Sequence, residues 1–142
     1  MQDTAPRPVD GLASAAARLE QINDTDRVPR GWYGFAQPYG WSLLVAALHD
    51  ALVARHPDYQ VFQVKEKFGG LRFYCSVDRE PDAAELIAQA EQQAQQTCQL
   101  SGQQGARLRT NQRGWSATLC DELAAAFEAG QPLWDLQLAG DA

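Results

Sequence analysis

Two cysteines in the C-terminal third are the residues whose spacing comes closest to a site of chemistry. Cys98 is followed by a short basic segment and then by Cys120 at an expected helix start, the layout of a zinc knuckle. Such a site needs four ligands, usually in two pairs separated by two residues. Cys98 and Cys120 hold the first position of each pair, but Ser101 and Leu123 hold the second. The sequence therefore predicts no bound metal and leaves the cysteines as relict ligand positions, buried and reduced.

The two histidines do not form a second site. His49 and His56 are seven residues apart, no third ligand stands at a helical spacing, and Pro57 follows directly. We expect two exposed or capping histidines. The chain also lacks a nucleophile elbow, a phosphate-binding glycine loop and a paired-histidine metal motif. These observations predict a protein that is not an enzyme and that holds no cofactor.

A longer pattern connects these residues. It comprises Gly40-Trp41, Lys-Glu-Lys-Phe-Gly-Gly-Leu-Arg-Phe-Tyr at 65–74, Cys98 with Gly102, and Leu119-Cys120-Asp121. Over roughly residues 40–123 the chain resembles a family of small, mostly uncharacterised phage and bacterial proteins. The family's Cys-x-x-Cys-Gly and Leu-Cys-Asp-x-His motifs imply a treble-clef-like zinc site, which is degenerate here at Ser101 and Leu123. The resemblance implies a fold and carries no activity.

Composition indicates one folded domain over residues 1–142, with a flexible tail at 1–9. The chain has 142 residues, 45% of them hydrophobic, and four tryptophans. It has no apolar run near the roughly 20 residues of a membrane span, and no basic N-terminal region followed by an apolar one. An odd number of cysteines, three, argues against a secreted disulfide framework. We therefore expect a cytoplasmic protein without a membrane partner.

The expected elements are helices around a β-hairpin, which gives an α+β fold. Val61 to Val64 and residues 71–77 are strand-like and flank Gly69-Gly70, and glycines accept the positive φ of a two-residue turn. This turn would place Val64 opposite Cys75 and Phe62 opposite Val77. A hairpin is marginal alone, so helical patterns at 12–22, 42–55, 82–94 and 119–129 must cover its apolar side. The central hairpin would thus be packed by three to four helices, beside a degenerate knuckle.

Aromatic and basic residues are the candidates for binding a partner. Residues 31–41 contain five aromatics among three glycines and a proline, and the outward side of the hairpin is basic. Loop aromatics can close over a core, or serve as hot spots for a protein and stacking platforms for bases. On the second interpretation we predict a partner-binding set of Trp32, Tyr33, Phe35, Tyr39, Lys65, Glu66, Lys67, Arg72 and Tyr74.

Charge separates along the chain although the total is −6. Residues 55–79 carry +2 and residues 98–115 carry +3, whereas residues 80–97 carry −4 and residues 116–142 carry −5. Ordinary solvated surface accounts for this separation, and so do two faces of opposite sign that steer a partner.

Two functions remain. The first is a non-catalytic protein-binding domain, in its most specific form an immunity protein whose acidic helices neutralise a basic toxin domain. The second is a phage-derived nucleic-acid accessory protein that has lost its zinc site. It would use the basic residues Lys65, Lys67, Arg72, Arg107, Arg109 and Arg113. The acidic total disfavours the second, because nucleic-acid binding depends on phosphate neutralisation.

Overall fold

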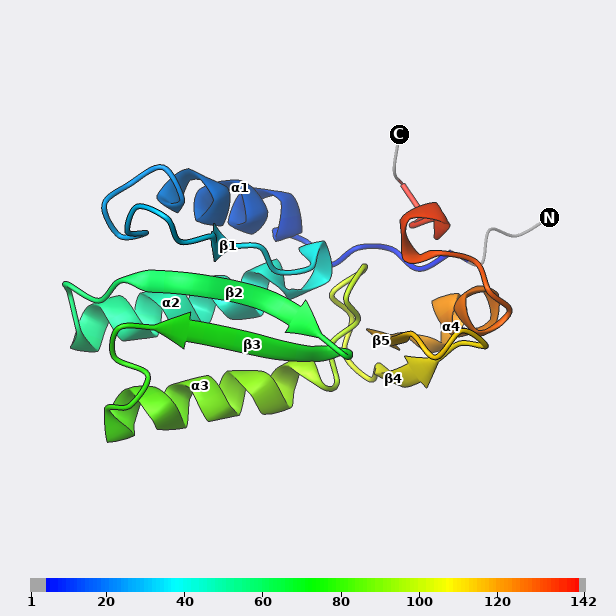
Figure 1. The fold of residues 1–142 in the computed structure, drawn as a ribbon. Helices are drawn as coiled ribbons and strands as arrows, with labels where there is room; N and C mark the ends of the chain where they lie inside the picture. Colours follow the sequence, from blue (N-terminus) through cyan, green and yellow to red (C-terminus); the bar gives the residue numbers. More distant parts are fainter. Residues whose placement is uncertain (1–4, 141–142) are drawn as a thin grey trace.

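The computed structural model describes residues 5–140 (Figure 1). In chain order, its helices and strands are α1 (Leu12–Ile22), β1 (Gly34–Phe35), η1 (Tyr39–Trp41), α2 (Ser42–Arg55), β2 (Val61–Lys67), β3 (Gly70–Cys75), α3 (Pro81–Ala94), β4 (Arg107–Thr110), β5 (Ser116–Leu119), α4 (Asp121–Glu128) and η2 (Leu133–Asp135). This is the α+β fold that the sequence predicts. The long hairpin β2–β3 lies at its centre.

A three-stranded sheet, ordered β1-β2-β3, carries the larger core. In Figure 1, α2 lies behind the sheet, with α1 above it and α3 below it. Side chains from these helices and from one face of the sheet form a single apolar cluster around Trp41, Leu52 and Val64. Strand β1 pairs in parallel with β2 and was not predicted, because two residues are too few to show a periodicity.

The hairpin turn differs from the prediction by one position. Lys67 pairs with Gly70, so the two loop residues are Phe68 and Gly69, and Val64 lies opposite Phe73 instead of Cys75. Both loop residues have positive φ, 54° and 82°. The register moves by two residues, and because side chains alternate with a period of two, the buried and exposed faces stay as predicted.

A β-bulge between Val61 and Gln63 moves Phe62 out of the core position that was predicted for it. The prediction placed Phe62 in the core opposite Val77, but the bulge gives the buried position to Val61. Phe62 is half-buried and packs against Trp32 with 4.8 Å between ring centroids. The prediction for Phe62 is therefore wrong.

A smaller core lies under the hairpin β4–β5 and α4, at the right of Figure 1. It contains Cys98, Leu119, Cys120, Leu123 and Phe127. The segment that precedes α1 is held against this part of the protein: the Val9 N–H donates to the Ser101 carbonyl over 2.8 Å, and Pro6 is buried. Residues 6–9 thus differ from the loose tail expected at 1–9, while residues 1–4 lie outside the described residues.

Two close contacts, one between backbone segments and one from a side chain to the backbone, join the parts of the protein that contain the two cores. The Gly40 N–H donates to the Gln99 carbonyl over 2.7 Å, and a Cβ on Gly40 would stand 2.1 Å from the Cys98 carbonyl oxygen. The Thr118 hydroxyl donates to the Gly69 carbonyl over 2.8 Å. The Phe68-Gly69 turn of the hairpin therefore docks on β5.

Gly69→Ala tests this docking. Its φ of +82° is strained for alanine, and the new Cβ would meet the Leu108 Cδ1 at 2.4 Å. We expect a loss of about 2 kcal/mol of unfolding free energy, from backbone strain and overpacking together. Gly114→Ala is the matched control: its φ is +81° and nothing lies within 4 Å, so about 1 kcal/mol of strain alone is expected. Equal losses in urea melts of the two variants would show that the exposed Leu108 side chain moves aside and that the turn is not packed closely against β4.

Candidate functional site

The outward side of the β2–β3 hairpin gathers aromatic and basic side chains on a surface that we call the open sheet face: Trp32, Phe62, Lys65, Lys67, Arg72 and Tyr74. Lys65 pairs across the strands with Arg72, and Gln63 with Tyr74. Trp32 is 51% exposed and Tyr74 44% exposed. Bulky aromatics beside cations are typical of protein contact sites.

The cations of this face are available to a partner. Among residues 5–140, Lys65, Lys67 and Arg72 form no ion pair within 4.0 Å. Lys67 stands over the Phe68 ring, 5.6 Å from its centroid. The basic residues of β4 differ, because Arg107 and Arg109 both pair with Asp121. The basic strip predicted from the sequence is therefore divided into a free part and a neutralised part.

Three of the predicted partner-binding residues lie elsewhere, whereas Tyr33 borders the open sheet face, since its N–H donates to the Phe62 carbonyl over 3.1 Å. Phe35 is 6% exposed, and its backbone is bonded on both sides by the Asn23 amide, so its place in the predicted set was wrong. Tyr39 is exposed but lines a hollow beside α1 with Glu20. The Glu66 carboxylate accepts the Gly69 N–H over 2.6 Å and faces the smaller core's hairpin. Tyr33 is 69% exposed, next to Trp32 in the chain.

The structure brings together Cys98 and Cys120, which the sequence analysis interprets as relict ligand positions. Cys98 and Cys120 are both buried and free, and the Ser101 N–H donates to the Cys98 sulfur over 3.4 Å. Burial opposes ionisation of Cys98, but hydrogen bonds from Ser101 and neighbouring backbone outweigh it and lower its pKa. Burial and the adjacent Cys98 raise the pKa of Cys120 to about 12. Of the two thiols, Cys98 therefore loses its proton more readily than Cys120.

This cluster does not have the composition of a metal centre. Ser101 and Leu123 are buried in the same place as the two thiols, where second ligands would stand. Within residues 5–140, no group of three or more His, Cys, Asp or Glu side chains could hold a metal ion. The apolar contacts of Leu123 and Phe127 fill the space under the knuckle.

We predict that the purified protein carries no stoichiometric zinc and that a chelator leaves its melting temperature unchanged, because two thiols are half of a zinc site. Ser101→Cys combined with Leu123→His should create a site with about one zinc per chain. Elemental analysis of both proteins gives the measurement, and Ser101→Cys alone serves as the three-ligand control. One zinc per wild-type chain would show the prediction to be wrong.

Comparison with known proteins does not assign the chain to a family. No protein-family model, curated protein or solved structure matches the chain. The resemblance to the phage and bacterial family therefore stays a prediction, as does a single domain over residues 1–142. Within residues 5–140, no helix is long and apolar enough to cross a membrane.

Sequence reasoning missed two exposed tryptophans outside the predicted set. Trp115 is 62% exposed and Trp134 is 79% exposed. Each stands in a short segment rich in turn-forming residues, where a large apolar side chain has little core to enter. A tryptophan in such a segment can be noticed in the sequence. The apolar residues near Trp115 and Trp134 nevertheless suggest that Trp115 packs in a small core and that the segment around Trp134 docks on the protein.

Proposed function

We propose that this chain is a non-catalytic protein-binding domain that acts in the cytoplasm and contacts its partner through the open sheet face. The observation that carries the proposal is the grouping of Trp32, Tyr74 and Arg72 with unpaired cations on one exposed sheet surface. Tryptophan, tyrosine and arginine are the residue types that dominate binding energy at protein interfaces. The three free thiols suit a reducing compartment.

The chemistry of this face favours a partner with an acidic surface and apolar pockets for the rings. The toxin-neutralising form of the proposal depended on acidic helices facing a basic toxin. Several helix carboxylates are instead engaged within the protein: Asp50 pairs with Arg18 over 2.9 Å, and Asp82 with His56 over 2.9 Å. Neutralisation of a toxin stays a prediction, and the identity of the partner decides it.

Nucleic acid is the less supported partner. The net charge is −6, and Arg107 and Arg109 are already paired with Asp121. Binding through the remaining cations would weaken steeply with salt, in proportion to the phosphates neutralised. Binding to a protein partner whose affinity falls much less with salt than that of nucleic acid would favour the proposal.

A photo-crosslinking amino acid at position 74 tests the proposal in the producing cell. The matched control places it at Gln92, an exposed position on α3. We expect position 74 to capture one protein that position 92 does not, and Arg72→Glu to abolish the capture. Capture of nucleic acid from position 74, or equal capture from both positions, would overturn the proposal.

A further inference from the structure

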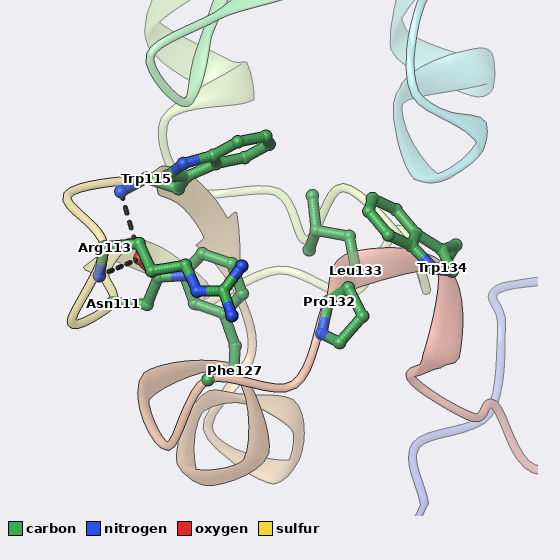
Figure 2. A pocket seen from close by; sticks show the side chains of 8 residues that line it. Asn111, Arg113, Trp115, Phe127, Pro132, Leu133 and Trp134 are labelled. Atoms are coloured by element: carbon green, nitrogen blue, oxygen red, sulfur yellow. Dashed lines mark hydrogen bonds between the residues drawn. The ribbon is translucent and has the colours of Figure 1, made fainter.

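A groove separate from the open sheet face runs between the β4–β5 turn and the segment after α4. It is lined by Arg113, Trp115, Phe127, Pro132, Leu133 and Trp134 and has a volume of about 190 Å³. Figure 2 shows the two indoles on either side of Leu133, with the Arg113 side chain extending between Trp115 and Phe127. We call it the tryptophan groove.

Both walls of the tryptophan groove are held in place by local hydrogen bonds. The Asn111 side-chain oxygen accepts the N–H groups of Arg113 and Trp115, each over 3.0 Å (Figure 2). On the other wall, the Gln131 side chain donates to the Asp135 carbonyl over 3.1 Å across η2. The groove is thus formed before any partner arrives, which lowers the entropic cost of binding.

The floor and the walls are apolar, and the groove has one cationic side chain. Phe127 is buried beneath it, and Leu133 and Pro132 are half-buried. Across residues 5–140 the Arg113 guanidinium has no carboxylate within ion-pair distance. A free guanidinium at an apolar groove selects a ligand in which a carboxylate stands next to an apolar group.

We propose that the tryptophan groove binds a segment of a partner protein in which an aromatic or branched aliphatic side chain stands next to an Asp or Glu. The apolar side chain would lie between the indoles on Leu133, and the carboxylate would pair with Arg113. The volume suits one side chain, since an engineered apolar cavity of about 150 Å³ holds benzene. This site and the open sheet face are independent, so either one can fail without the other.

The test uses two peptides with acetylated N-termini and amidated C-termini, Ala-Phe-Glu-Leu-Ala and Ala-Phe-Gln-Leu-Ala. They differ only in the carboxylate or amide of the third residue. Titration into the full-length protein is followed through the indole N–H resonances of Trp115 and Trp134. We expect the Glu peptide to shift both resonances at millimolar concentration and to bind about threefold more tightly than the Gln peptide, the ratio that an ion pair with the exposed Arg113 supplies.

Three variants test whether the peptides bind in the groove itself. Arg113→Gln should remove the difference between the peptides, and Trp134→Ala should remove binding of both. Trp134 is 79% exposed, so its replacement should leave the fold intact. Trp32→Ala, on the open sheet face, is the matched control and should leave the affinity for both peptides unchanged. No shift at millimolar Glu peptide, equal affinity for both peptides, tighter binding of an oligonucleotide, or a concentration-dependent dimer that buries the indoles would each overturn the proposal.

Discussion

Trp41→Ala is expected to destabilise the protein by about 4 kcal/mol, the usual cost of deleting a large buried aromatic side chain. Trp41 is fully buried and its indole N–H donates to the Thr97 carbonyl over 2.8 Å. The replacement leaves a cavity in the larger core and an unpaired carbonyl at the start of the knuckle. Urea melts with a fitted m-value give the measurement.

A second variant separates the two contributions of Trp41. Trp41→Phe keeps most of the ring but removes the donor, so it should cost about 1–3 kcal/mol for the buried carbonyl left without a partner. Trp115→Ala is the control, because that indole is 62% exposed and its loss should stay within about 0.5 kcal/mol. Equal losses for Trp41→Ala and Trp115→Ala would show that Trp41 does not anchor the core.

The sequence predicted those helices and strands in which the apolar pattern repeats over enough residues to show its period. Helix α2 ends at Arg55 as its pattern indicates, and the hairpin faces follow from alternation, with Val64, Phe73 and Cys75 buried. Cys98 and Cys120, whose spacing resembles that of a zinc knuckle, also lie together in the smaller core.

The features that the sequence did not predict depend on contacts between distant segments. The turn moved to Phe68-Gly69, where the Gly69 carbonyl meets the Thr118 hydroxyl, 49 residues away in sequence. The Thr118 hydroxyl is therefore engaged by the turn, and Cys120 directly precedes α4. Asp82 likewise bonds to His56. Local sequence patterns carry no information about such distant partners.

The tryptophan groove was missed for the same reason. Trp115 and Trp134 are 19 positions apart, and only the packing of Leu133 and Phe127 in the smaller core brings their segments together. The open sheet face could be predicted better, because Lys65, Arg72 and Tyr74 belong to one hairpin. The bulge that brings Phe62 into contact with Trp32 could not be predicted from the sequence.

His49 is a further residue for which the prediction was wrong, and we expect it to govern the response of the protein to mild acid. Expected to be exposed or capping, it is 5% exposed, and its Nδ1 is hydrogen-bonded to the Tyr59 hydroxyl. Burial lowers the pKa of His49 from 6.5 to about 4, and the positive charge of Arg27 adds to the shift. The folded protein therefore keeps this imidazole neutral.

Acidification is accordingly expected to destabilise the protein through His49. Below pH 6.5 the unfolded chain binds a proton at His49 that the folded chain does not, so the unfolding free energy falls as the pH falls. The loss should be about 2 kcal/mol by pH 5 and about 3 kcal/mol by pH 4, where it levels off as the folded form protonates. Asp50 and Asp121, whose pKa values are lowered by their arginine partners, lose their stabilising effect only at lower pH.

Urea melts between pH 7 and pH 5 therefore isolate the histidine. His49→Gln keeps a hydrogen-bonding group near Tyr59 but cannot titrate, so it should cost stability at pH 7 and flatten the pH dependence over this window. His56→Gln is the matched control, since His56 is half-buried and bonded to Asp82 over 2.9 Å. It should leave the loss between pH 7 and pH 5 in place. A wild-type slope that survives in His49→Gln would show that another group causes the acid sensitivity, and that the buried imidazole carries a proton in the folded protein.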